Sequence, residues 1–213
     1  EVVVYQFADA AKPRAETGDF GYIPSSSNVY IPLTFETQFQ FPKFVDFPNG
    51  FLEKLTRASL FGAHSASGDT TTTTIPGTDL NFKVYADTNE NNKTQFVLET
   101  NIGSISSLTS SFYEDVYDNT NWTFAVRTKP REYPFASEVT ASHIFDFEFY
   151  GVNYVAGYKL HEFSASAEVA LHDDLGKFIT GSNKRLYLGA NRANITGTLN
   201  NKTNARLLAA RVW

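Results

Sequence analysis

The chain contains no cysteine and no methionine, although it is 213 residues long. Without cysteine the fold does not depend on disulfides, which excludes a small disulfide scaffold, and a thiol nucleophile is excluded as well. A natural reading frame begins with Met, whereas this chain begins with Glu1. We therefore expect a processed product or an excerpt of a larger polypeptide.

Positive charge is also scarce, because 18 Lys and Arg face 23 Asp and Glu and give a formal net charge of -5. Such a chain has no basic field to attract a phosphate backbone, so nucleic acid is not an expected partner. No apolar run approaches the ~20 residues that a membrane helix requires. The sequence therefore predicts no membrane insertion.

Aromatic residues, in contrast, are abundant: the chain has 19 Phe and 11 Tyr, and 15% of its residues are aromatic. These side chains can form a large core without covalent staples. All-β sandwiches commonly reach ~200 to 250 residues as one unit. We expect one domain, with an N-terminal strand and irregular arm over residues 1–27 and a β-sandwich over residues 28–213.

Apolar side chains alternate with polar ones along many short segments, which is the pattern of β-strands. Within residues 29–41, for example, Leu33, Phe35 and Phe39 fall on one face, whereas Glu36 falls on the other. The expected strands lie at residues 2–7, 29–41, 58–63, 80–86, 94–100, 122–128, 142–150, 162–170, 185–189 and 205–213. In the last of these both faces carry apolar side chains, so we expect that strand to lie between two layers.

Five segments resemble the concanavalin A-like, laminin-G-like jelly rolls, in the order expected for that fold. They are LTFETQFQF (33–41), SLFGAH (59–64), NWTFAVRTKP (121–130), KRLYLGANR (184–192) and RLLAARVW (206–213). The chain looks most like modules of virion structural proteins of tailed bacteriophages, in which a phrase similar to GANRANITG (189–197) precedes a strand ending in Arg-x-Trp. In that family the last strand continues into a short acidic segment, which this chain lacks.

This resemblance implies an all-β fold, a concanavalin A-like (laminin-G-like) jelly-roll β-sandwich of two antiparallel sheets packed face to face. It places Phe35, Trp122, Phe124, Leu186 and Leu188 on the inner faces of the two sheets. The alternation pattern by itself favours a sandwich. It does not separate a jelly roll from an immunoglobulin-like arrangement.

The motifs that catalysis requires are incomplete. Some jelly rolls of this type are retaining glycosidases, in which two carboxylates flank the scissile bond ~5 to 5.5 Å apart. Asp146 and Glu148 share one strand face, but Ile144 stands where that chemistry needs a nucleophilic Glu. No Gly-x-Ser-x-Gly elbow and no His-Glu-x-x-His pair is present. We therefore predict no catalytic residue and no enzyme activity, with Asp146 and Glu148 on a solvated strand face.

Two stretches carry oxygen side chains in arrangements that suit calcium. Asp87 and Asn89 alternate like the start of a calcium loop, but Asn92 replaces the glycine of the sharp turn, and a hairpin turn explains this stretch better. Asp173 and Asp174 offer adjacent carboxylates in a loop, and some laminin-G-like modules hold one calcium ion at such a rim. We expect no required cofactor, with Asp173 and Asp174 as candidate Ca²⁺ ligands.

A glycan site needs exposed aromatic rings near a polar concavity, because the apolar face of a sugar stacks on a ring while its hydroxyls bond to polar groups. The candidate rings are Tyr113, Tyr117, Tyr154 and Tyr158. Most aromatic residues at alternating positions belong to a core, so each of these rings is also a candidate core residue.

Three functional hypotheses follow from these patterns. The first is a non-catalytic structural and interaction module of a virion capsid, tail or fibre protein, which contacts neighbouring subunits of an oligomeric assembly through loops and sheet edges. The second is a carbohydrate-binding, lectin-like adhesin module on a virion or on another secreted or cell-surface protein, with a cell-surface glycan as its partner. The third, a jelly-roll glycoside hydrolase, ranks last because its carboxylate motif is broken.

Overall fold

The structure is a computed structural model. It describes residues 3–6, 33–43, 55–66, 79–105, 107–131, 144–170, 175, 178, 183–193 and 198–212.

Within these residues the strands form two large antiparallel sheets and one small ladder. The six-stranded sheet has the order β1-β10-β3-β4-β5-β6, with bounds Val3–Gln6 (β1), Asn183–Leu188 (β10), Arg57–Ala66 (β3), Asp79–Thr88 (β4), Thr94–Thr100 (β5) and Ser107–Tyr113 (β6). The five-stranded sheet has the order β13-β2-β7-β8-β9, with bounds Arg206–Val212 (β13), Leu33–Phe41 (β2), Thr120–Pro130 (β7), Ile144–Val155 (β8) and Tyr158–Ala170 (β9). The ladder pairs β11 (Asn191–Arg192) with β12 (Leu199–Asn200).

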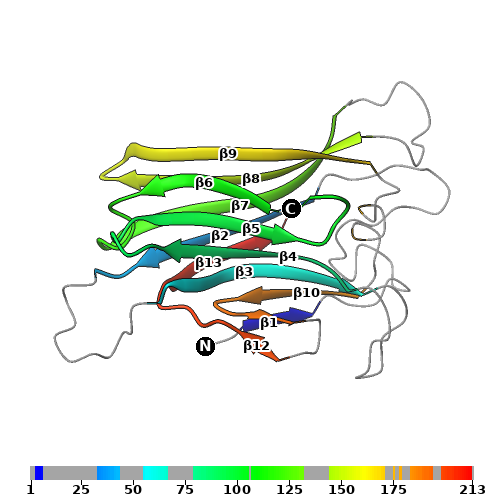
Figure 1. The fold of residues 1–213 in the computed structure, drawn as a ribbon, viewed down its shortest axis with the longest axis horizontal. Coiled ribbons are helices and arrows are strands. Elements are labelled where there is room, and N and C mark those ends of the chain that lie inside the picture. Colours follow the sequence, from blue (N-terminus) through cyan, green and yellow to red (C-terminus); the bar gives the residue numbers. More distant parts are fainter. Residues whose placement is uncertain are drawn as a thin grey trace.

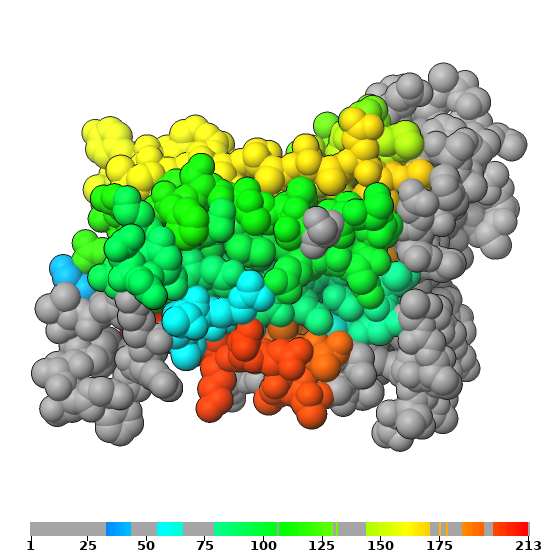
Figure 2. All heavy atoms as spheres, in the orientation of Figure 1, coloured from blue at the N-terminus to red at the C-terminus, as the bar shows by residue number. Residues whose placement is uncertain are grey.

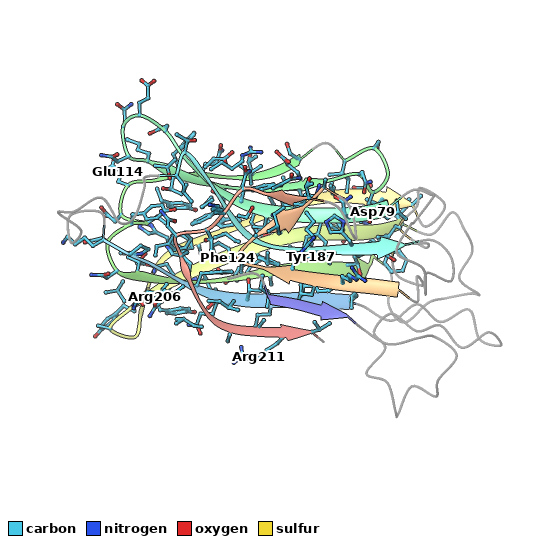
Figure 3. All side chains as sticks on the ribbon, turned by 90° about the horizontal axis from the view of Figure 1, so that it is seen from below. Asp79, Glu114, Phe124, Tyr187, Arg206 and Arg211 are labelled. Carbon is cyan, nitrogen blue, oxygen red and sulfur yellow. The ribbon has the colours of Figure 1, made fainter. Side chains whose placement is uncertain are left out.

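The two large sheets pack face to face around an aromatic core. The ring of Phe35 on β2 lies 5.1 Å from that of Phe82 on β4, and Phe96 on β5 lies 4.7 Å from Phe124 on β7. In the side view of Figure 3, Phe124 lies between the two layers. Such edge-to-face and tilted ring pairs add to the burial of apolar surface, so the core stabilises both sheets together.

The chain crosses repeatedly between the layers, because β1 and β2 lie in different sheets, as do β6 and β7, and β9 and β10. In Figure 1 the strands of both sheets run along the long axis of the molecule, with β9 at one side and β1 at the other. Two antiparallel sheets joined in this manner form a jelly-roll β-sandwich of the concanavalin A-like kind. The predicted fold class is therefore confirmed.

The inner residues that the resemblance implied are confirmed. Phe35, Trp122, Phe124, Leu186 and Leu188 are all buried, and every other residue of β2 from Leu33 to Phe41 is buried as well. Among the strands of the two large sheets, the pattern missed β6, whose sequence SLTSSFY is polar. In this strand only Leu108 and Ser110 are buried, because β6 lies at the edge of its sheet.

The prediction for the last strand was wrong. Of the neighbours that the structure describes, β13 pairs with β2 alone, so it forms an edge of the five-stranded sheet. Its inward side chains Ala210 and Val212 pack against the core, but Leu207 and Leu208 are 36% and 49% exposed. Apolar groups on both faces of a strand do not require two covering layers when a bulge, here between Leu207 and Ala209, turns one leucine outward.

The part of the outer face of the six-stranded sheet at β3 is covered by the chain itself, whereas Ser107, Thr109 and Ser111 on β6 are exposed. We call residues 189–193 and 198–204 the covering segment, which lies beside β3 in Figure 2. The Ser59 amide donates to the Lys202 carbonyl at 3.0 Å, and the Gly189 amide donates to the Leu60 carbonyl at 2.7 Å. These bonds anchor the covering segment to β3, where the Ser59 side chain is buried and its hydroxyl donates to the Asn200 carbonyl at 3.2 Å.

Candidate functional site

The outer face of the five-stranded sheet, here called the open face, carries polar side chains aligned in rows across the strands. The first row follows the register Glu36, Ala125, Tyr150 and Ser164 on β2, β7, β8 and β9. The second row, one pleat away, follows Thr34, Arg127, Glu148 and Ser166. Side chains in such rows lie close enough to interact across the strands, so each row acts as one continuous surface.

A groove of about 290 Å³ lies where these two rows meet, and we call it the sheet groove. It is lined by Thr34, Ala125, Arg127, Glu148, Tyr150 and Ser164. Ala125 and Ser164 are the direct cross-strand neighbours of Tyr150 on its two sides. Because these two residues are short and Tyr150, Arg127 and Glu148 are long, the surface is hollowed between them.

Charge in the sheet groove is balanced by an ion pair. Arg127 on β7 stands opposite Glu148 on β8, and its Nε donates to Oε2 of Glu148 at 2.5 Å. The Nη2 group of Arg127 pairs with the same oxygen. Within the residues that the structure describes, Nη1 of Arg127 and Oε1 of Glu148 have no hydrogen-bond partner, so the pair offers one donor and one acceptor side by side.

Tyr150 is held in place by a second set of contacts. Its hydroxyl donates to Oε1 of Glu162 at 2.7 Å, and Lys159 Nζ donates to Oε2 of the same carboxylate at 2.5 Å. Desolvation and the hydrogen bond to Glu162 raise the pKa of Tyr150 to about 12. The ring is therefore neutral at physiological pH, and its hydroxyl stays bound to Glu162.

These groups match the chemistry of a sugar. An aromatic ring can stack on the apolar face of a pyranose, and an arginine–carboxylate pair can bond to two neighbouring hydroxyls at once. The Thr34 and Ser164 hydroxyls at the border of the sheet groove add groups that both donate and accept hydrogen bonds. The sheet groove can therefore bind an uncharged, polyhydroxylated ligand without leaving its own polar groups unpaired.

Tyr154 and Tyr158, two of the predicted ring platforms, lie in the hairpin that joins β8 to β9. The turn contains Ala156 and Gly157, which both adopt positive φ angles of 51° and 84°. Tyr154 is 53% exposed and Tyr158 is 80% exposed. The hairpin thus presents both rings to solvent, Tyr154 on the same side of β8 as Tyr150, and their role in glycan binding stays a prediction.

The other two predicted platforms belong to the protein interior or its border. Tyr117 is buried, its ring lies 5.2 Å from that of Phe41, and its hydroxyl donates to Oδ1 of Asn204 at 2.9 Å. A ring enclosed in this way cannot stack on a sugar, so the prediction for Tyr117 was wrong. Tyr113 is half-buried, and its ring lies 5.1 Å from that of Trp122. It lies where β6 contacts β9.

Asp146 and Glu148, the two carboxylates that share a strand face, lie on the open face, as predicted. Their neighbours along β8, Phe145, Phe147 and Phe149, are buried. Asp146 accepts a hydrogen bond from Arg131 at 3.1 Å, and Glu148 pairs with Arg127. Both carboxylates are thus engaged by arginines.

The stretch that starts at Asp87 forms the predicted hairpin turn between β4 and β5. Oδ1 of Asn89 accepts bonds from the amides of Asn91 and Lys93, both at 3.0 Å, and Asn92 has a positive φ angle of 60°. No cluster of three metal-binding side chains occurs in the part of the chain that the structure describes. The candidate calcium ligands Asp173 and Asp174 lie outside the described residues.

Sequence reasoning missed the combination of residues that lines the sheet groove. Arg127 and Glu148 are 21 positions apart, and Thr34 lies on a third strand. The usable signal was the alternation of β7 and β8, which places Arg127, Glu148 and Tyr150 on outward positions. Only the pairing register shows that these outward positions are neighbours.

Comparisons with known proteins do not assign the chain to a family. No family model matches the chain, and no curated protein matches it. Among solved structures, the native heptameric SAP-like pentraxin from Limulus polyphemus is similar at 10% sequence identity and a TM-score of 0.40, over 92% of this chain and 74% of the pentraxin chain. Function is therefore inferred from the groove itself. The residues that the structure describes include no helix of the length and apolarity needed to cross a membrane.

Proposed function

We propose that this chain is a non-catalytic recognition module that binds carbohydrate in the sheet groove. The observation that carries this proposal is the grouping of the Tyr150 ring, the Arg127–Glu148 pair and two hydroxyl side chains around one hollow of about 290 Å³. Small-molecule sites combine such a concavity with a few convergent polar groups. Neither an acid and nucleophile pair nor a metal cluster is part of this groove.

The test is direct binding of oligosaccharides, first on a glycan array and then by titration calorimetry. We expect Tyr150→Ala to weaken binding at least tenfold, because the stacking surface is removed. Tyr158→Ala is the matched control, since it removes an exposed tyrosine of the same sheet outside the groove. If Tyr158→Ala abolished binding and Tyr150→Ala did not, the hairpin and not the groove would be the site.

A second candidate is the virion module expected from the sequence, which contacts neighbouring subunits of a capsid, tail or fibre within the particle. The observation that favours it is the exposed edge strand β13, on which Leu207 and Leu208 face solvent. An open strand edge with apolar side chains is suited to pairing with another chain. In this proposal the partners are virion subunits, and the groove side of the module faces outward from the particle.

This second proposal is tested in the complete virion protein. We expect Leu208→Lys to reduce incorporation of the protein into particles, because a charge on the edge opposes strand pairing. Lys202→Ala, at an exposed position that precedes β13, serves as the control. Normal incorporation of Leu208→Lys would contradict a subunit contact through β13. Secretion or display at a cell surface is the alternative location for a carbohydrate-binding module.

A further inference from the structure

Most charged side chains of the open face, in the part of the chain that the structure describes, are paired with one another. Arg211 bonds to Glu36 at 2.6 Å, and Arg131 bonds both to Asp146 at 3.1 Å and to Glu168 at 2.5 Å. The same is true next to and within the sheet groove, where Lys159 pairs with Glu162 and Arg127 with Glu148.

This pairing decides what kind of sugar the face can select. A carboxylate of an acidic sugar that bonded to Nη1 of Arg127 would lie beside the negative charge of Glu148, which repels it. An uncharged sugar meets no such repulsion, because among the described contacts Nη1 can donate to one hydroxyl and Oε1 of Glu148 can accept from another. Charge pairs within the protein therefore act against acidic ligands and leave neutral ones unaffected.

The outward positions of β8 extend this surface toward the hairpin. Tyr150 and Tyr154 are four residues apart on the same side of the strand, which corresponds to ~13 Å at ~3.3 Å per residue. Besides desolvation and Glu162, the phenol of Tyr154 contributes electrostatically to the raised pKa of Tyr150. Val152, the outward residue between them, is only 6% exposed, whereas Tyr154 is 53% exposed.

We infer that the ligand is an uncharged oligosaccharide that lies along β8, with one ring on Tyr150 in the sheet groove and a further ring on Tyr154. This inference rests on the proposed carbohydrate function and adds the class and the direction of the chain. An open groove contacts only one side of a sugar, so a single ring gains little affinity. Contacts with successive sugar units supply the rest.

The experiment compares neutral and acidic oligosaccharides of matched length by titration calorimetry. The neutral probes are cello- and chito-oligosaccharides from the disaccharide to the hexasaccharide, and the acidic probes are oligogalacturonides of the same lengths. We expect a neutral series to bind with affinity that rises with length and does not change between low and high salt. Tyr154→Ala should weaken binding of the longer chains about five- to tenfold and leave the disaccharide unchanged.

Glu148→Gln provides a gain-of-function test. Since this change removes the negative charge that engages Arg127, we expect the variant to bind oligogalacturonides about tenfold more tightly than the unaltered protein, in a manner that high salt suppresses. Salt-sensitive binding of oligogalacturonides by the unaltered protein would overturn the inference while supporting carbohydrate recognition. If Tyr154→Ala weakened the binding of all chain lengths equally, the inference would likewise be overturned while carbohydrate recognition was supported. Binding of neither series would overturn the carbohydrate function together with the inference.

Discussion

The two outer faces of the sandwich are treated in opposite ways. The six-stranded sheet has the part of its outer face at β3 buried under the covering segment, where Asn191 lies against both Ser59 and Gly62. The five-stranded sheet keeps its outer face in solvent and lines it with paired charges, hydroxyls and the ring of Tyr150. In Figure 3, Arg211 lies on this outer side, away from the core. The part of the six-stranded sheet under the covering segment therefore contributes to stability, whereas the open face is exposed to solvent and to ligands.

The largest effect on the stability of the covered region is expected from a substitution at Gly62. A Cβ atom at this position would lie 2.4 Å from Oδ1 of Asn191 and 2.7 Å from the carbonyl oxygen of Phe82. We expect Gly62→Val to lower the free energy of unfolding by about 3 kcal/mol, because backbone and covering segment must both shift. Urea denaturation measures this effect. An unchanged midpoint would mean that the covering segment is loosely attached.

Ala125 is the matched position on the open face. Ala125→Leu adds a side chain next to Tyr150, where it fills the sheet groove without meeting the core. We expect carbohydrate affinity to fall about tenfold or more, whereas the free energy of unfolding changes by less than ~0.5 kcal/mol. Calorimetry and urea denaturation of the same variant separate the two effects. A variant that loses stability but retains binding would reverse the roles assigned to the two faces.

A smaller effect is expected at Asn191, which is fully buried under the covering segment and donates from Nδ2 to the Ser59 hydroxyl at 3.4 Å. Asn191→Ala removes this weak hydrogen bond and leaves a small void, so the free energy of unfolding should fall by about 1 kcal/mol. Thr34→Ala on the open face is the control and should leave stability within ~0.5 kcal/mol. Equal losses in both variants would show that the faces do not differ in their contribution.

The smallest effect concerns pH. The hydrogen bond from Lys159, followed by that from Tyr150, lowers the pKa of Glu162 below 4.5. The ionised Glu162 carboxylate holds Lys159 and the Tyr150 hydroxyl. The contribution of these contacts is fully present above the unfolded pKa of Glu162 and is lost as the pH falls through its lower folded pKa. We expect carbohydrate affinity to be constant from pH ~8 down to ~5 and to fall only in more acidic solution. Glu162→Gln should bind with no such acid limb, and a midpoint near neutrality would contradict this assignment.

Sequence alone was sufficient for the inner faces but not for the edges. Alternation is strict in β2 and over residues 144–151 of β8, because one side of each strand packs on the core, so the apolar positions there are unambiguous. At an edge this constraint relaxes. The exposed leucines of β13 therefore led to a wrong prediction of burial. The polar sequence of β6 gave no strand prediction at all.

The site was predictable only in part, for a similar reason. That Asp146 and Glu148 face outward follows from their spacing, and the exposure of Tyr154 and Tyr158 is consistent with the pattern around them. The neighbours of Tyr150 come from strands that are distant in sequence, and their register depends on how the whole sheet assembles. No local signal distinguishes Tyr117, which is buried, from an exposed tyrosine.

The pairing of β13 with β2 has a consequence for how the chain reaches its native state. Val212 stands opposite Phe35, and β1 stands opposite β10, so both sheets are completed by segments that are far apart along the polypeptide. Bringing segments so far apart in the sequence together has an entropic cost that precedes these contacts. High contact order slows folding to milliseconds or seconds. Until that pairing forms, the edge of β2 is open, and an open strand edge is a site at which chains associate.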